Sequence, residues 1–72
     1  MSYPIPNIGD MVRIPQNTLL TANNKLVWLK MSEPDYGVVI DIDRTKWPKV
    51  YKVFVKGSIW DAAEDDVHLT EV

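Results

Sequence analysis

The segment from residue 50 to residue 57 alternates apolar and polar side chains more regularly than any other part of the chain. Its odd positions hold three apolar side chains, Tyr51, Val53 and Val55. Its even positions hold two lysines on either side of an aromatic ring, Lys52, Phe54 and Lys56. A period of two residues is typical of a half-buried β-strand. The segment therefore predicts a strand whose odd side chains enter the core and whose even side chains form a basic face.

A second alternating stretch covers residues 37–43. Its even positions are apolar, Val38, Ile40 and Ile42, and its odd positions include two carboxylates, Asp41 and Asp43. In an unbroken strand the three even side chains share one face, and Val39 lies on the other face with the two carboxylates. The stretch predicts a strand of that kind.

A shorter strand is predicted near the N-terminus. Pro4 and Pro6 favour an extended lead-in over residues 1–7. A turn signal at Gly9-Asp10 then precedes a strand over residues 11–14. Two side chains of this strand are expected to face inward, Val12 and Ile14.

The C-terminal part alternates short elements with tight turns. Gly57-Ser58 predicts a tight turn into a short strand over residues 59–61. Residues 62–66 are too few for a stable helix and suit one 3₁₀ turn. Residues 67–72 close the chain as a strand, on which His68 points outward.

Residues 15–35 form the least regular part of the chain and are predicted to be a long loop. Polar and turn-forming residues fill most of it, and Pro15 ends the preceding strand or leaves it on an edge. The apolar run over residues 26–31 predicts a short strand within it, or a loop pinned by its apolar side chains. Pro34 and Asp35 belong to a turn that leads into the next strand.

The fold class predicted from these elements is all-β. No segment shows a period of 3.6 residues over the ~11 residues that a helix requires. Short strands separated by turn signals indicate a barrel or sandwich, and a five-stranded barrel leaves few open edges in so short a chain. We expect one domain over residues 8–72, preceded by the lead-in of residues 1–7.

Three segments resemble parts of the SH3-like barrels. Residues 9–14 look like their entry strand, residues 37–40 like their second strand, and residues 63–69 like the 3₁₀ turn that delivers the closing strand. The Gly-Asp-x-Val-x-Ile opening, with Gly-x-Val-Ile after it, also resembles KOW-type barrels of ribosomal and transcription proteins. The small barrel protein of photosystem I has a similar rhythm. The resemblance implies a five-stranded barrel with a long first loop.

The resemblance indicates little about function, because proteins with unrelated activities share this fold. The 3₁₀ segment has Ala62-Ala63-Glu64 where signalling SH3 domains have Pro-x-x-Tyr, so proline-rich peptide binding is not implied. In size and style the sequence is similar to small accessory proteins of tailed bacteriophages. That similarity implies a phage protein acting on a host protein or on the virion.

Composition and charge limit the chemistry, the cellular location and the kinds of partner that we expect of this protein. The 72 residues include no cysteine, so neither disulfides nor thiolate metal sites are available. The first ten residues lack the basic and apolar regions of a signal peptide. We therefore expect a cytoplasmic protein, in the host cytoplasm if it is viral. The formal net charge is −2, which disfavours a general nucleic-acid binder.

Basic and aromatic residues nevertheless gather over residues 44–56, and this gathering is the candidate site. A protein-binding face is predicted to comprise Trp47, Lys52 and Phe54, extended by Trp28 and Tyr36 from the long loop. The alternative is a nucleic-acid surface, in which cations hold phosphate and rings stack on bases: Arg44, Lys46, Lys49, Lys52 and Lys56. A third interpretation is a solvated sheet face, on which Asp41 and Asp43 pair with Lys52 or Lys56.

Catalytic and metal chemistry have little basis in the sequence. The single histidine, His68, has no orienting partner, and three glycines form no phosphate-binding loop. The carboxylates lack the spacing of a calcium loop. We expect no enzyme, no catalytic or metal-binding residues and no cofactor. The preferred function is binding of another protein; the alternatives are a nucleic-acid module and a structural component of a larger assembly.

Overall fold

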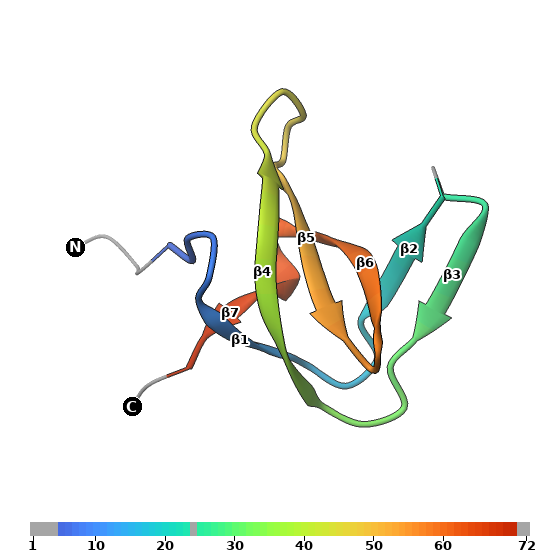
Figure 1. Ribbon diagram of the computed structural model, residues 1–72. Helices are drawn as coiled ribbons and strands as arrows, with labels where there is room; N and C mark the ends of the chain where they lie inside the picture. The colour runs from blue at the N-terminus through green and yellow to red at the C-terminus, as the bar shows by residue number, and fades with distance from the viewer. Residues whose placement is uncertain (1–4, 24, 71–72) are drawn as a thin grey trace.

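The computed structural model describes residues 5–23 and 25–70, and Figure 1 shows them as a small structure of strands without an α-helix. The strands are β1 (Met11–Ile14), β2 (Leu19–Ala22), β3 (Val27–Lys30), β4 (Asp35–Asp43), β5 (Val50–Val55), β6 (Ser58–Ala63) and β7 (His68–Leu69). A 3₁₀ turn, η1 (Glu64–Asp66), precedes β7. The all-β class and the position of the 3₁₀ turn are confirmed. In the described part no helix has the length and apolarity to cross a bilayer.

All seven strands belong to one antiparallel sheet in the order β3-β2-β6-β5-β4-β1-β7. The prediction of a closed five-stranded barrel differs from this sheet in two ways. The region of the long loop contributes two strands, β2 and β3. Within the described residues no pairing joins the two edge strands, so the sheet is curled but not closed.

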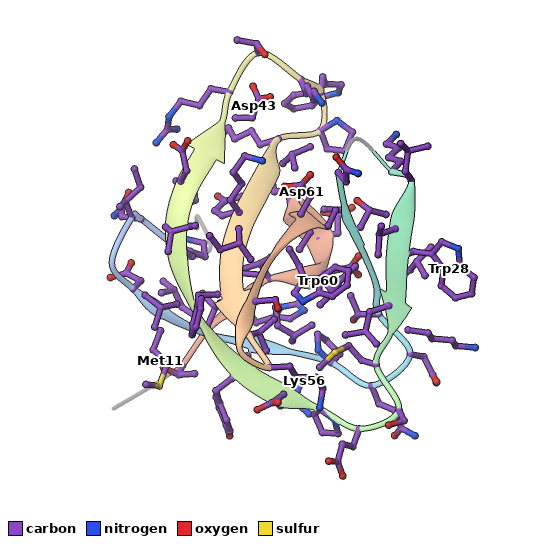
Figure 2. All side chains as sticks on the ribbon, turned by 45° about the vertical axis from the view of Figure 1, so that its right-hand side comes forward. Met11, Trp28, Asp43, Lys56, Trp60 and Asp61 are labelled. Atoms are coloured by element: carbon purple, nitrogen blue, oxygen red, sulfur yellow. The ribbon has the colours of Figure 1, made fainter. Side chains whose placement is uncertain are left out.

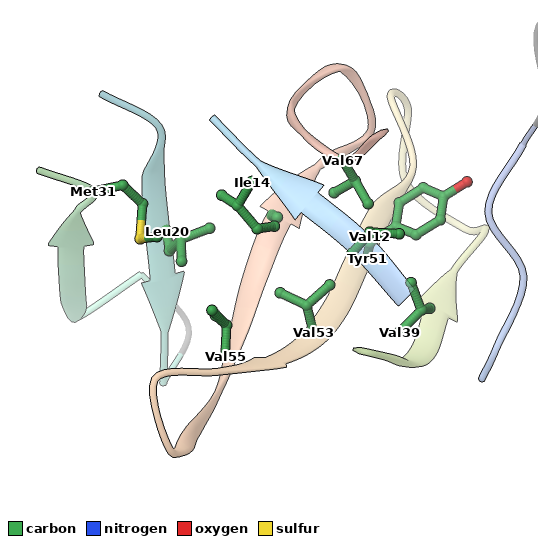
Figure 3. Packing of buried hydrophobic residues seen from close by; sticks show 10 residues of the cluster. Val12, Ile14, Leu20, Met31, Val39, Tyr51, Val53, Val55 and Val67 are labelled. Carbon is green, nitrogen blue, oxygen red and sulfur yellow. The ribbon is translucent and has the colours of Figure 1, made fainter. Parts of the chain in front are cut away.

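The core lies inside the curl, where β1 packs over β5 (Figure 3). The odd side chains of β5 are buried as predicted, and so are the two inward residues of β1: Tyr51, Val53, Val55, Val12 and Ile14. Half-buried Trp60 packs against this cluster from β6, which pairs with β5 along its whole length. Packing inside the curl holds the fold together, since the chain has no disulfide.

The predicted faces of β4 are wrong, because a β-bulge interrupts the strand. Val39 pairs with Val53 and Asp41 pairs with Lys52, so Ile40 is an extra residue without a partner on β5. The extra residue reverses the alternation. Val39 is buried and Val38 and Ile40 are exposed, whereas Ile42 beyond the bulge packs against the core.

The predicted long loop is instead a hairpin of β2 and β3 that pairs with β6 through Thr21 and Asp61. Leu20 on β2 and Met31 just after β3 are fully buried in the core. The expectation of a strand in residues 26–31 is confirmed by β3, whereas β2 was missed. The hairpin therefore belongs to the folded core.

The C-terminal elements shift slightly from their predicted positions. Val55 pairs with Ser58, so the turn is Lys56-Gly57, one residue earlier than expected. Both turn residues have positive φ, 53° and 78°, as a two-residue hairpin loop of type I′ requires. Lys56 thus belongs to the turn and not to the face of β5. The closing strand is shorter than predicted, and its last two residues lie outside the described part, as do residues 1–4 of the lead-in.

Candidate functional site

The outer face of the sheet carries a row of exposed apolar side chains. Directly opposed residues on neighbouring strands share a face, and the registers align Met11 with Val38, Val38 with Phe54, and Phe54 with Ile59. All four are exposed by 38% or more. We call these four residues the apolar row. Tyr36, two residues from Val38 on β4, extends it on the same face.

The next row of directly opposed residues on the outer face is charged, and we call it the charged level. Asp41, Lys52 and Asp61 oppose one another on β4, β5 and β6. The ammonium Nζ of Lys52 lies 2.9 Å from the Oδ1 atom of Asp61 and donates a hydrogen bond to it. This bond, with the attraction of Asp61, Asp41 and Asp43, raises the pKa of Lys52 against a smaller opposing effect of desolvation. Lys52 is thus engaged within the sheet.

The ion pairs in the structure differ from those that the third interpretation of the sequence expects. Lys52 bonds to Asp61 on β6 and Lys56 lies 3.5 Å from Asp35, so neither cation bonds to Asp41 or Asp43. Asp43 instead accepts hydrogen bonds from the backbone N–H and the hydroxyl of Thr45. These bonds lower the pKa of Asp43 and brace the start of the loop after β4.

A groove of about 340 Å³ opens beside the charged level. One wall is the β2–β3 hairpin, with Leu19, Thr21 and Lys25. The other wall is the β4–β5 loop, and the floor is the C-terminal half of β6. The loop contributes Lys46, Trp47, Pro48 and Lys49, next to Val50 of β5, and β6 contributes Asp61, Ala62 and Ala63.

The rim of the groove is basic and aromatic. The Trp47 side chain is 88% exposed, the largest exposure among the described large hydrophobic residues. Three lysines line the groove, Lys25, Lys46 and Lys49, against one carboxylate, Asp61, which Lys52 already pairs. The groove is therefore positively charged although the chain as a whole carries −2.

The structure separates the predicted protein-binding residues into several places. Trp47 lines the groove, and Lys52 reaches the groove's edge through its bond to Asp61. Phe54 and Tyr36 belong to the apolar row and its extension. Trp28 lies on β3, and Figure 2 shows its ring directed away from the body of the sheet.

The predicted nucleic-acid residues also divide. Lys46 and Lys49 line the groove and Arg44 is exposed in the same loop, whereas Lys52 and Lys56 are held in ion pairs. Sequence reasoning missed the wall formed by Leu19, Thr21 and Lys25. The local sequence has no signal for this wall, because it depends on β2 pairing with a strand about forty residues later.

Other chemistry has little support in the geometry. His68 is exposed on β7, opposite Arg13, so its predicted outward direction is confirmed. Across residues 5–23 and 25–70 no three His, Cys, Asp or Glu side chains converge as metal ligands would. The groove brings lysine side chains, a tryptophan and apolar contacts together in one concave place.

Comparisons with family models, curated proteins and solved structures found no match to this chain. The function must therefore be argued from its own residues. They define a small all-β protein with a basic groove and an exposed tryptophan at its rim.

Proposed function

We propose that this protein is a non-enzymatic binding module whose groove takes an acidic segment of another protein. The observation that carries the proposal is Trp47, almost fully exposed at the rim of a groove lined by lysines. Tryptophan is enriched among the residues that dominate binding energy at protein interfaces. An exposed indole beside a concave apolar surface has the composition of such an anchor.

The charge of the groove selects the kind of partner. Lys25, Lys46 and Lys49 approach from both walls, and the single carboxylate is neutralised by Lys52. Complementary charge accelerates association and disfavours partners of the wrong sign. The floor and walls also offer apolar contacts, Leu19, Pro48, Val50 and Ala62. A segment with acidic residues around one large apolar side chain fits both features.

The fold that we propose is an opened variant of the SH3-like barrel. Its support is the order of elements: β1, a long segment, β4, a short loop, β5, a tight turn, β6, a 3₁₀ turn and β7. The hairpin of β2 and β3 occupies the long segment. The setting that we propose, a bacteriophage accessory protein acting on a host protein or on the virion, is supported by similarity in size and style.

An NMR titration of isotope-labelled protein tests the groove. The probes are short Asp/Glu-rich peptides that carry one leucine or phenylalanine, with a lysine-rich set as the control of opposite charge. We expect acidic peptides to shift the indole N–H resonance of Trp47 and the backbone amides of Lys49 and Asp61. Trp47→Ala should weaken binding by about tenfold or more without lowering thermal stability.

Two control variants, matched to Trp47→Ala, show whether the binding energy comes from the groove. Trp28→Ala removes an exposed tryptophan outside the groove, and Phe54→Ala removes the ring of the apolar row; both should leave the affinity for acidic peptides unchanged. Shifts centred on the apolar row, or no shifts with any peptide, would overturn the groove as the site. With Trp47→Ala as negative bait, affinity capture then identifies the natural partner.

A nucleic-acid function is the second candidate, favoured by the three cations of the β4–β5 loop, Arg44, Lys46 and Lys49. It predicts that a single-stranded oligonucleotide binds at low salt, with an affinity that falls steeply as salt rises because phosphate contacts release counterions. No binding at low salt removes this candidate. Binding tighter than that of every acidic peptide would replace the proposed protein partner.

A further inference from the structure

β3 is the outermost strand on its side of the sheet, and its second edge has no strand beside it within the described residues (Figure 1). Natural proteins protect such an edge with prolines, bulges or charges, because it offers unpaired main-chain groups to other strands. β3 contains no proline, its register with β2 is regular, and its single charged residue is Lys30 at the C-terminal end. Val27 and Trp28 are both exposed.

The main-chain hydrogen bonds show which residues of β3 face the free edge. The N–H of Met31 donates to the carbonyl of Thr18, and the carbonyl of Met31 accepts from the N–H of Asn17. Met31 thus directs both of its main-chain groups towards β2. Because this direction alternates along a strand, Leu29 also faces β2, whereas Trp28 and Lys30 direct their N–H and C=O groups outward.

We propose that the free edge of β3 pairs with β3 of a second copy of this chain, antiparallel, about a two-fold axis at Leu29. This register sets Trp28 of each copy opposite Lys30 of the other. Each of these pairs can exchange two main-chain hydrogen bonds, so the outward groups of both residues are satisfied. The sheets of the two copies become continuous.

Side-chain charges complement one another in this register. Lys25 lies three residues before Trp28, and Glu33 lies three residues after Lys30. Both residues are exposed and lie outside β3, Lys25 in the turn before it, with a φ of 69°, and Glu33 in the bend after it. The antiparallel pairing therefore brings the end of β3 next to Lys25 beside the end of the second copy's β3 next to Glu33. Trp28 and Lys30 of the second copy also share the outer face, where an ammonium over an indole ring is attractive.

Neighbouring registers are less favourable. A shift that sets Trp28 opposite itself moves Lys30 opposite Leu26, whose N–H already donates to the carbonyl of Asn23. The opposite shift sets Lys30 against Lys30 of the second copy, and like charges directly opposed are destabilising. The register centred on Leu29 avoids both.

Cysteine cross-linking tests the register, since the natural chain has no cysteine. Leu29 would face itself in a non-hydrogen-bonded pair with Cα atoms about 4.5 Å apart, which a disulfide can bridge. We expect mild oxidation of Leu29→Cys to give a covalent dimer. Val27→Cys is the matched control on the same face of the same strand and should stay monomeric. Cross-linking of Val27→Cys without Leu29→Cys would overturn the register.

Charge reversal tests the pairing without altering the core. Sedimentation of the wild type, from about 10 µM to about 1 mM as suits a small interface, should show a reversible monomer–dimer equilibrium. Lys25→Glu or Glu33→Lys alone should weaken dimerisation several-fold, and the double variant should restore it. Arg44→Glu, a charge reversal in the β4–β5 loop, which lies across the groove from the hairpin and not at the free edge of β3, should leave it unchanged.

The outcomes of these experiments distinguish self-pairing through β3 from peptide binding in the groove. Trp47→Ala should weaken peptide binding by about tenfold or more and leave the dimer intact, and Lys25→Glu with Glu33→Lys should leave dimerisation as in the wild type. A protein that stays monomeric up to about 1 mM, with no cross-link through Leu29→Cys, overturns self-pairing. An edge that pairs with a strand of a different protein would give that result.

Discussion

Lys52 lies between two carboxylates on the outer face, yet it bonds to one of them. Asp41 and Asp61 are both directly opposite it, and the hydrogen bond goes to Asp61. The Asp61 side chain is only 23% exposed, whereas Asp41 is an exposed residue. A bond to a partly desolvated carboxylate is stronger than one to a fully solvated carboxylate. This choice removes most of the positive charge from the face of β5.

Lys52→Met should lower the free energy of unfolding by about 0.2–1 kcal/mol at neutral pH, the range of partly exposed ion pairs. Because folding raises the pKa of Lys52 above its ordinary 10.5, its contribution is present below that pH and is lost as the pH rises through the folded value. Urea unfolding of the wild type and the variant near neutral and near strongly alkaline pH measures the difference.

Asp61→Asn supplies the control for Lys52→Met. The two substitutions remove the same interaction, so the double variant should lose little more than either single variant. The loss should also shrink at high salt, since the pair is partly exposed to solvent. A stability difference that is equal at both pH values would contradict an ionic origin.

β4 changes its inward-facing residues along its length because of the bulge at Ile40. Before the bulge the buried positions are the odd ones, Gly37 and Val39, and after it Ile42 packs against the core. A Cβ added at Gly37 would lie 2.8 Å from the carbonyl oxygen of Phe54, so β4 and β5 approach closely there. A bulge increases the local twist of a strand. The bulge therefore adds to the twist of β4 where the strand crosses the core.

Ile40→Ala and Ile42→Ala distinguish the bulged strand from an unbroken one, in which the two residues would be equivalent. Ile42→Ala should cost about 2 kcal/mol, because its side chain packs against the core. Ile40→Ala should cost less than about 1 kcal/mol, because Ile40 is exposed and unpaired. Thermal unfolding of both variants measures the contrast, and equal losses would contradict the bulge.

The β2–β3 hairpin joins the small core of the whole molecule to both proposed binding surfaces. Leu20 enters the core, Leu19 and Thr21 form a wall of the groove, and β3 offers the free edge. In the proposed dimer the two grooves therefore take a fixed relative position. A partner with two acidic segments would gain avidity from this arrangement, because its second binding step becomes intramolecular.

Leu20→Ala should destabilise the protein by about 3 kcal/mol, since the side chain is fully buried. A chain of this size without disulfides has a total stability of only about 4–11 kcal/mol. The variant should therefore have a much lower melting temperature. Leu26→Ala, in the same hairpin but 78% exposed, is the control and should melt like the wild type. Equal melting of both variants would mean that the hairpin is not part of the core.

Short-range patterns determined much of the fold. The alternation over residues 50–56 was enough to place Tyr51, Val53 and Val55 in the core, and Val12 and Ile14 followed from the same period. The 3₁₀ turn and the outward direction of His68 were also predictable. The physical reason is that the face taken by a side chain in a regular strand depends only on the parity of its position.

The tertiary structure decided the rest. The bulge at Ile40, the strand β2 and the choice of Asp61 by Lys52 each depend on strands distant in the sequence, whose pairing local alternation does not specify. The basic face of β5 looked like a single surface in the sequence. Pairing within the sheet neutralised Lys52, put Phe54 into the apolar row and left Trp47 to line a groove whose second wall comes from β2.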